Sequence, residues 1–306
     1  MGDLEEKKLT FLTVGSASPY FVKNQTMQIR DYNFNWNQRT YIMGILNVTP
    51  DSFSDGGEYN ELQKAVNQAL VMVKDGADII DIGGQSTRPG ALEVTLEEEL
   101  NRVIPVIKAI REKTDIPISI DTTRAEVAQR AIASGADIIN DISGATFDPD
   151  MLDTVARLQV PIILMHIRGN PQTMQTMTDY QDLIGEIEEF FLDRIAQCVQ
   201  KGITKSNIII DPGIGFAKNY QQNIDILNNI KRLKNLGFPM LIGTSRKSFI
   251  GKILNENDPA KRVWGTGATC SHAISQGADI LRVHDVAPMY DITRVADAIT
   301  RSKSDY

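Results

Sequence analysis

The chain has 306 residues, 42% hydrophobic and 23% charged, which is the composition of an ordinary globular protein. Its net charge of -7 and its lack of a basic stripe argue against nucleic-acid binding, although a local cationic pocket can still hold an anion. The two cysteines fit no metal or disulfide pattern, and no apolar run approaches the roughly 20 residues of a membrane span. Because the acidic amino terminus also lacks a secretory signal, we expect a cytoplasmic protein without a membrane partner.

Residues 1–40 are the least regular part of the sequence. Short strands are predicted over 9–15 and 26–30, and the stretch 33–37 is rich in turn residues. We expect residues 1–40 to form an arm or hairpin that packs on the bottom of the main domain.

From residue 41 onward, strand, loop and helix alternate. Continuous apolar runs predict strands that are buried on both faces, as in parallel sheets. The expected strands span 41–47, 78–82, 117–121, 137–142, 161–166, 207–211, 239–244 and 280–284. The expected helices span 58–76, 95–114, 124–135, 148–159, 181–202, 220–237, 259–277 and 288–302.

One short joint recurs three times between a helix and a strand. The sequence Gly-Ala-Asp occupies 76–78, 135–137 and 277–279, and each copy combines a glycine helix cap with a strand start. This repetition favours repeated βα units, and eight such units predict an α/β fold with a (β/α)8 TIM barrel over residues 41–306. A doubly wound open sheet is the alternative, but it would usually have fewer strands and a glycine fingerprint after the first.

Every predicted strand ends in a polar residue. In barrel enzymes the active site lies at the carboxyl ends of the strands. A single polar residue there often only caps the next helix, whereas eight out of eight indicate a shared site. These strand-end residues are Asn47, Asp81, Asp121, Asn140 with Asp141, His166, Asp211, Thr244 with Ser245, and Arg282 with His284.

Side-chain alternation along a strand narrows some of these assignments. Arg282 and His284 are two residues apart, so they point to the same side. Asn140 and Asp141 are adjacent and must point to opposite sides, and the strand pattern leaves open which of them faces the site.

The strand-end residues fall into two chemical groups. Carboxylates and amides such as Asp121 and Asp211 can accept parallel N–H bonds from a flat heterocycle. Arg88, Lys247 and Arg282 are cationic, and Lys247 with Ser248 opens a predicted helix whose free N–H groups favour an anion. Together the two groups predict a ligand that combines a heterocycle with phosphate or pyrophosphate.

Other common signatures do not fit. The stretch DPGIGF at 211–216 lacks the third glycine of a dinucleotide fingerprint, and 243–248 resembles a phosphate loop only loosely. The three histidines have no zinc-binding spacing, whereas Trp264, Met174 and Met177 are typical of packing or loop residues.

Two glycine-flanked loops follow the first two strands, at 49–57 and 83–90. They place hydroxyls, a phenylalanine and charges over the expected mouth. They are either ordinary flexible loops or lids that close on the substrate and exclude water.

Five motifs, in order, resemble those of the dihydropteroate synthase family. They are MGILNVTPDSFSDGG at 43–57, DIGGQSTRPG at 81–90, DPGIGF at 211–216, GTSRKSFIG at 243–251 and RVHDV at 282–286. The resemblance runs over residues 41–300, and its one small departure is Gln85, where many members carry Glu.

The resemblance implies condensation of 6-hydroxymethyl-7,8-dihydropterin pyrophosphate with p-aminobenzoate, which gives 7,8-dihydropteroate and pyrophosphate in folate biosynthesis. It implies a barrel fold, Mg2+ and a homodimer. By motif position, the pterin contacts would be Asp121, Asn140, Asp211 and Lys247, which favours Asn140 over Asp141. Asn47 would contact the metal or pyrophosphate, and Arg282 with His284 would hold the pyrophosphate. Thr87, Arg88, Pro89, Phe216 and Ser248 would shape the p-aminobenzoate site.

The residues agree with this chemistry, because an arylamine needs no strong base and the difficult step is departure of pyrophosphate. We therefore expect an SN1-like displacement at the pterin methylene, in which Asn47, Lys247, Arg282 and His284 serve as the catalytic group. The alternatives are a pterin-binding methyltransferase barrel, which needs no pyrophosphate clamp, and a non-catalytic pterin-binding protein.

Overall fold

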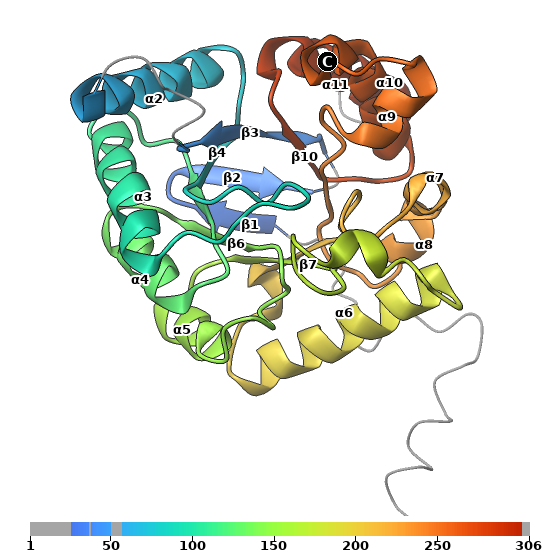
Figure 1. Ribbon diagram of the computed structural model, residues 1–306, viewed down its shortest axis with the longest axis horizontal. Coiled ribbons are helices and arrows are strands. Elements are labelled where there is room, and N and C mark those ends of the chain that lie inside the picture. The colour runs from blue at the N-terminus through green and yellow to red at the C-terminus, as the bar shows by residue number, and fades with distance from the viewer. Residues whose placement is uncertain (1–25, 37, 50–56, 302–306) are drawn as a thin grey trace, which may run out of the picture.

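The computed structural model describes residues 26–36, 38–49 and 57–301. Eight parallel strands lie at the centre, and helices surround them (Figure 1). The strands are β3 (Tyr41–Asn47), β4 (Ile79–Gly83), β5 (Ile118–Asp121), β6 (Ile138–Asp141), β7 (Ile162–Met165), β8 (Ile208–Asp211), β9 (Leu241–Ile242) and β10 (Ile280–Val283).

The strands close into a barrel. Their order is β8-β7-β6-β5-β4-β3-β10-β9, and a parallel bridge between Ile210 and Met240 joins β8 to the residue that precedes β9. The prediction of a (β/α)8 barrel is confirmed, and the alternative of an open sheet is wrong, because the two terminal strands of the order meet.

The helices lie on the outside and bury one face each against the strands. They are α2 (Gly57–Lys74), α3 (Leu96–Arg111), α4 (Ala125–Ala133), α5 (Met151–Leu158), α6 (Leu183–Gln200), α7 (Tyr220–Asn228), α8 (Ile230–Lys234), α9 (Ser248–Leu254), α10 (Val263–Ser275) and α11 (Val286–Thr300). Three short 3-10 helices are η1 (Met174–Thr176), η2 (Lys205–Asn207) and η3 (Pro259–Arg262). None of the helices in the described ranges combines the length and apolarity that a membrane span requires.

The prediction of one continuous helix over 220–237 is wrong, because the helix breaks at Asn229. The backbone of Asn229 leaves the helical conformation, with φ -114° and ψ 12°. Its side chain donates a hydrogen bond to the carbonyl oxygen of Asp225 at 2.8 Å. Asparagine favours such local bonds over regular helix, which accounts for the separation of α7 and α8.

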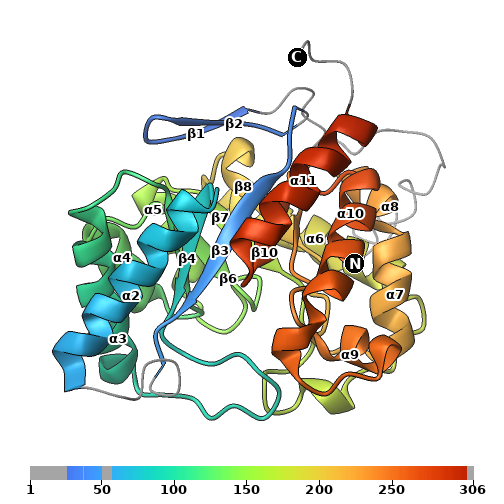
Figure 2. The same ribbon diagram turned by 90° about the horizontal axis from the view of Figure 1, so that it is seen from above.

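An antiparallel hairpin covers the amino-terminal end of the barrel. It consists of β1 (Thr26–Ile29) and β2 (Tyr32–Asn35), and Figure 2 shows it across that end. Its inward side chains form one apolar cluster with the first inward residues of the barrel strands. The cluster contains Met27, Ile29, Phe34, Trp36, Tyr41, Met43, Ile79, Ile138, Ile163, Ile209, Leu241 and Ile280.

A hairpin is therefore present and the strand predicted over 26–30 appears in it as β1, but its partner is Tyr32–Asn35, which was not predicted to be a strand. The segment 33–37 was expected to be turn, but Tyr32–Asn35 pairs with β1 and the chain turns at Arg30 and Asp31 instead. Phe34 explains the difference, because its ring packs on Trp36 and Tyr41 at centroid distances of 5.4 and 4.7 Å. The strand expected over 9–15 lies outside the described residues.

The three Gly-Ala-Asp joints share one stabilising device. Gly76, Gly135 and Gly277 all have positive φ, as helix-capping glycines do. The joint aspartates Asp78, Asp137 and Asp279 then accept the backbone N–H of Ile42, Ile118 and Met240 at 2.8, 2.9 and 2.8 Å. Each carboxylate also pairs with a cation, from Arg39, Arg111 and Lys234 respectively. The repeated motif therefore links each joint to a neighbouring strand.

Trp264 departs from the expectation that it is a packing residue, because its side chain is 74% exposed at the start of α10. Met174 is buried in η1 and Met177 follows it in a loop, as expected of packing and loop residues.

We expect Phe34→Ala to lower the free energy of unfolding by about 3–5 kcal/mol, because it leaves a cavity between the hairpin and the barrel. Urea unfolding measures the change. The matched control is Tyr32→Ala on the same strand: Tyr32 is 37% exposed, whereas Phe34 is 1% exposed. Equal small losses for both variants would show that the hairpin does not stabilise the barrel.

Candidate active site

The carboxyl-terminal half of the barrel interior is lined by charged and amide side chains. Arg282 on β10 lies between two carboxylates: its Nε donates to Asp81 Oδ2 and its Nη2 to Asp121 Oδ2, both at 2.6 Å. Asn140 on β6 donates weakly to the same Asp81 carboxylate, at 3.3 and 3.4 Å. Four strands thus contribute to one buried polar cluster.

Asn140, and not Asp141, is the residue that reaches this cluster. Asp141 is also buried, but its Oδ1 accepts bonds from the backbone N–H and the hydroxyl of Ser143 at 2.7 and 2.6 Å. Burial raises the pKa of Asp141 to about 6, against the lowering effect of those bonds. The two neighbours therefore point apart, as strand alternation requires.

The pKa values of the two interior aspartates respond to burial. Burial raises the pKa of Asp121 to about 7, although the Arg282 guanidinium opposes the shift. Burial also raises the pKa of Asp211, against the N–H of Gly213, which donates to its carboxylate at 2.8 Å, and against Lys247. Both carboxylates gain by binding N–H donors, because each donor stabilises the ionised form.

Lys247 lies at the turn that precedes α9, close enough to Asp211 for the two charges to interact. Its Nζ is 4.4 Å from the centroid of the Phe216 ring and donates to the carbonyl oxygen of Ile214. Burial lowers the pKa of Lys247 to about 8, although Asp211 raises it. Lysine, phenylalanine and aspartate thus form one wall of the site.

His284 lies near the cationic side chains of Arg246 and Arg282. Its Nδ1 lies 3.0 Å from the hydroxyl of Ser245, which also accepts the backbone N–H of His284 at 3.1 Å. Burial lowers the pKa of His284 to about 3, and the charges of Arg246, Arg282 and Arg88 lower it further. His284 is therefore neutral near pH 7 and can donate one N–H without carrying charge.

The second predicted lid crosses the mouth of the barrel. The N–H of Gly90 donates to the carbonyl oxygen of Pro171, in the loop that follows β7, at 2.9 Å. Thr87 is half-buried there, whereas Arg88 and Pro89 are exposed, as is Ser248 at the start of α9. These four residues lie on the rim and not in the interior.

Asn47 is half-buried at the last position of β3, in register with Gly83 of β4. Residues 50–56 of the first predicted lid lie outside the described part of the chain, so the structure does not describe this loop.

Comparisons with known proteins identify the family of the chain. The family model described as pterin binding enzyme matches residues 43–284. A dihydropteroate synthase of Synechocystis is 63% identical over 268 residues, which are 88% of this chain and 93% of that protein. The chain belongs to the dihydropteroate synthase family.

Solved structures of the dihydropteroate synthase family share the fold. The enzyme of Clostridium difficile, determined in the presence of pteroic acid, has a TM-score of 0.84 and 47% identity, and covers 88% of this chain and 100% of its own. That of Xanthomonas albilineans with 4-aminobenzoic acid has a TM-score of 0.85 and 41% identity, over 92% and 100% of the two chains.

The sequence did not assign a role to Lys218, which is buried beside the family motif at 211–216. Its Nζ lies 2.8 Å from Nδ1 of His166 and donates to the His166 carbonyl oxygen at 3.1 Å. Burial lowers its pKa well below the usual value. Gly213 must be glycine there, because a Cβ would lie 2.0 Å from that carbonyl oxygen. Nothing in a lone loop lysine predicts this contact.

Asp81 was recognised as one of the strand-end residues of the shared site but was given no role in it. Two signals were available in the sequence. Asp81 is two residues before Gly83 and so points to the same side of the strand, and it is the first residue of the second family motif. The structure shows that it binds Arg282 and Asn140, both of which the sequence had assigned.

Proposed function

We propose that this site condenses 6-hydroxymethyl-7,8-dihydropterin pyrophosphate with p-aminobenzoate, to give 7,8-dihydropteroate and pyrophosphate, a step of folate biosynthesis. The observation that carries the proposal is the buried carboxylate and amide wall that faces Lys247, Arg282 and His284 at the same strand ends. Such a site suits a ligand with a flat heterocycle at one end and a polyanion at the other. The dihydropteroate synthase relatives support this reading over a methyltransferase or a non-catalytic barrel.

In this proposal the pterin lies in the barrel interior. Asp121 and Asp211 accept N–H bonds from the heterocycle, and Asn140 adds its amide oxygen. Lys247 donates to a ring acceptor and keeps the Phe216 ring beside the reacting carbon. Thr87, Arg88, Pro89, Phe216 and Ser248 form the p-aminobenzoate site at the rim, where exposure lets the second substrate enter.

The pyrophosphate lies toward Asn47, Arg282 and His284. The described residues contain no group of three or more His, Cys, Asp or Glu that could enclose a metal. Mg2+ often binds through one or two protein oxygens together with phosphate oxygens and water, and the Asn47 amide at the end of β3 fits that arrangement. Bound Mg2+ would supply positive charge to the departing pyrophosphate.

The reaction follows from the distribution of charge. As the bond from the pterin methylene to pyrophosphate breaks, negative charge grows on the leaving oxygen and is stabilised by Arg282 and the N–H of His284. Positive charge on the methylene carbon is shared with the pterin ring, which Asp121 and Asp211 hold. The neutral amine then attacks the methylene carbon and its nitrogen loses one proton to water, so the displacement is SN1-like. A carbon isotope effect typical of a tight, associative transition state would contradict this order of bond changes.

We expect pyrophosphate release from the pterin substrate only when both p-aminobenzoate and Mg2+ are present. Release is measured with a coupled pyrophosphate assay. Tight pterin binding by the wild type without amine-dependent release would identify a binding protein instead of an enzyme.

Asp211→Ala should weaken pterin binding by about 1.5–3 kcal/mol, the usual contribution of a hydrogen bond to a charged group.

We expect kcat/KM for the pterin substrate to be highest between about pH 7 and 8, because this ratio follows the ionisation of the free enzyme. Asp121, with a pKa of about 7, must lose its proton to accept N–H bonds, so the ratio rises with pH there. Lys247, with a pKa of about 8, loses its charge as pH rises further, so the ratio falls.

The matched variant for this profile is Lys247→Arg, which keeps its charge at high pH. The fall of kcat/KM on the alkaline side should occur at a higher pH in this variant, whereas the rise on the acid side should stay at the same pH. This comparison does not depend on the maximal rate of the variant. An unchanged alkaline limb would exclude Lys247 as its origin, because ionisation of the substrate is common to both proteins.

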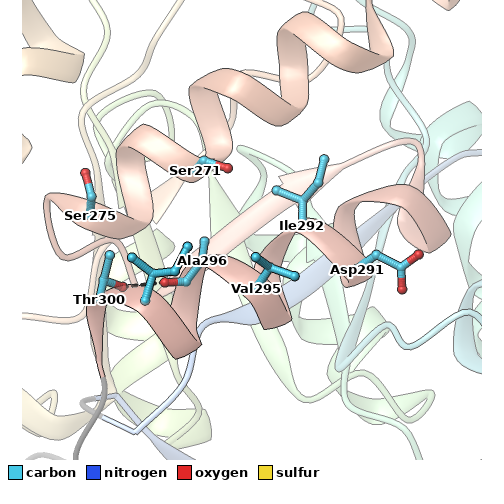
Figure 3. Close-up of a pocket in the computed structure, with 8 residues that line it drawn as sticks. Ser271, Ser275, Asp291, Ile292, Val295, Ala296 and Thr300 are labelled. Atoms are coloured by element: carbon cyan, nitrogen blue, oxygen red, sulfur yellow. Dashed lines mark hydrogen bonds between the residues drawn. The ribbon is translucent and has the colours of Figure 1, made fainter.

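We also propose that two copies associate through the face formed by α10 and α11. Figure 3 shows the groove between these helices, with small serines on α10 and aliphatic side chains on α11. Val295 and Ile299 are 61% and 73% exposed, and Trp264 shares one side of α10 with Ser271 and Ser275 by helical spacing. An exposed apolar face with small residues suits close packing of helices from a second copy.

We expect the wild type to sediment with the mass of two chains and Ile299→Asp with the mass of one, because a carboxylate on this face would lose its hydration on association. Val71→Asp, on the exposed side of α2, is the control and should keep the mass of two chains. A two-chain mass for Ile299→Asp would place the interface elsewhere.

A cytoplasmic location is proposed from the free, buried thiols of Cys198 and Cys270, which suit a reducing compartment. Fractionation of cells that express the chain tests it, and recovery from a membrane or secreted fraction would exclude it.

A further inference from the structure

Asp81 lies deeper in the barrel than the carboxylates assigned to the pterin. In the parallel register it pairs with Ser119, whereas Asp121 pairs with Gly83, so Asp81 lies one inward-facing position below Asp121. Its side chain is 0% exposed. A ligand in the mouth therefore reaches Asp121 before it could reach Asp81.

Arg282 divides its donors between these two carboxylates. Nε binds Asp81 and Nη2 binds Asp121, each at 2.6 Å, and within the described residues Nη1 makes no hydrogen bond. Asp121 thus has one oxygen that already accepts a bond from the protein. A heterocycle that donates to this oxygen competes with Nη2 for it, while the bond to Asp81 is out of its reach.

Asn140 depends on the same deep carboxylate. Its Nδ2 lies 3.3 and 3.4 Å from the two oxygens of Asp81, so the N–H2 end of the amide faces Asp81. The carbonyl oxygen of Asn140 is left as the end that a ligand can use. Asp81 therefore determines both the place of a guanidinium and the orientation of an amide.

We propose that Asp81 is a positioning residue that keeps Arg282 anchored through Nε while the substrate replaces Nη2 on Asp121. The released Nη2, together with Nη1, then faces the pyrophosphate end of the ligand. This inference rests on the proposed function. Without Asp81, Asp121 is the one carboxylate among the described residues that still binds Arg282, so the guanidinium moves onto Asp121, occupies the pterin wall and leaves the pyrophosphate.

The first test is Asp81→Asn, which keeps the shape of the side chain but removes its charge. We expect kcat/KM for the pterin substrate to fall roughly 100-fold, the loss that a displaced positioning group can cause. Inhibition by inorganic pyrophosphate should weaken in the same variant, while KM for p-aminobenzoate should stay within about twofold, since that substrate binds at the rim.

The matched control is Asp279→Asn. Asp279 is equally buried and paired with a cation, Lys234, but it lies at the opposite end of the barrel. This variant should lose stability and keep both Michaelis constants and the pyrophosphate inhibition. If Asp81→Asn behaves like Asp279→Asn, Asp81 is a structural residue and the proposal is wrong.

A double variant covers the case in which Asp81→Asn does not fold. Replacing both members of a buried ion pair is tolerated better than replacing one. If Asp81 acts through Arg282, then Asp81→Asn added to Arg282→Met should change pyrophosphate affinity by less than about twofold, because coupled residues are not additive. A further tenfold loss would show that Asp81 acts independently of Arg282.

Calorimetric binding of inorganic pyrophosphate is measured apart from turnover in all five proteins: wild type, the three single variants and the double variant. A wild type that binds pyrophosphate but forms no product would contradict the proposed function, and the comparison of Asp81→Asn with wild type would still decide the role of Asp81.

Discussion

A guanidinium between two buried carboxylates is the interaction on which the site depends. Arg282 comes from the last strand of the barrel and binds Asp81 and Asp121, which precede it by 201 and 161 residues. Removing one partner of such a buried pair generally costs about 3–5 kcal/mol, because a charge is left without compensation. These contacts therefore require β4, β5 and β10 to hold their positions around β3, so the site depends on the pairing of these strands in the sheet.

The two ends of the barrel carry different chemistry. At the amino-terminal end, the inward positions are apolar and pack under the β1–β2 hairpin, with the joint aspartates at the strand starts. At the carboxyl-terminal end, the inward positions two residues further along β4, β6, β8 and β10 are polar and hold Asp81, Asn140, Asp211 and Arg282. Most of the buried apolar side chains lie between the strands and the surrounding helices, while the carboxyl-terminal interior holds charges that would not stabilise the fold by themselves.

Much of the fold and part of the site could be predicted from the sequence. Apolar runs with polar ends revealed the eight strands, and strand alternation placed Arg282 and His284 on one side. The alternation could not choose between Asn140 and Asp141, because an isolated strand has no inside until its neighbours are placed. The break at Asn229 depends on one side-chain bond to Asp225, and the exposure of Trp264 depends on what packs beside α10.

The contacts between distant loops were the least predictable part. Lys218 binds His166 across 52 residues, and a lone lysine in a loop gives no sign of its partner. Asp81 was visible as a strand-end residue, but its role follows from Arg282 on a strand that is not its neighbour. In both cases the chemistry comes from the three-dimensional arrangement and not from local sequence spacing.

The hairpin across the amino-terminal end restricts how substrates enter the barrel and how products leave it. With that end packed, both substrates and both products share the mouth at the opposite end. In the proposed arrangement the pterin occupies the interior and the arylamine the rim, so an arylamine that arrived first would obstruct the way in. Geometry alone then favours an ordered reaction in which the pterin substrate binds first. The condensed product, which spans both positions, leaves as a single molecule.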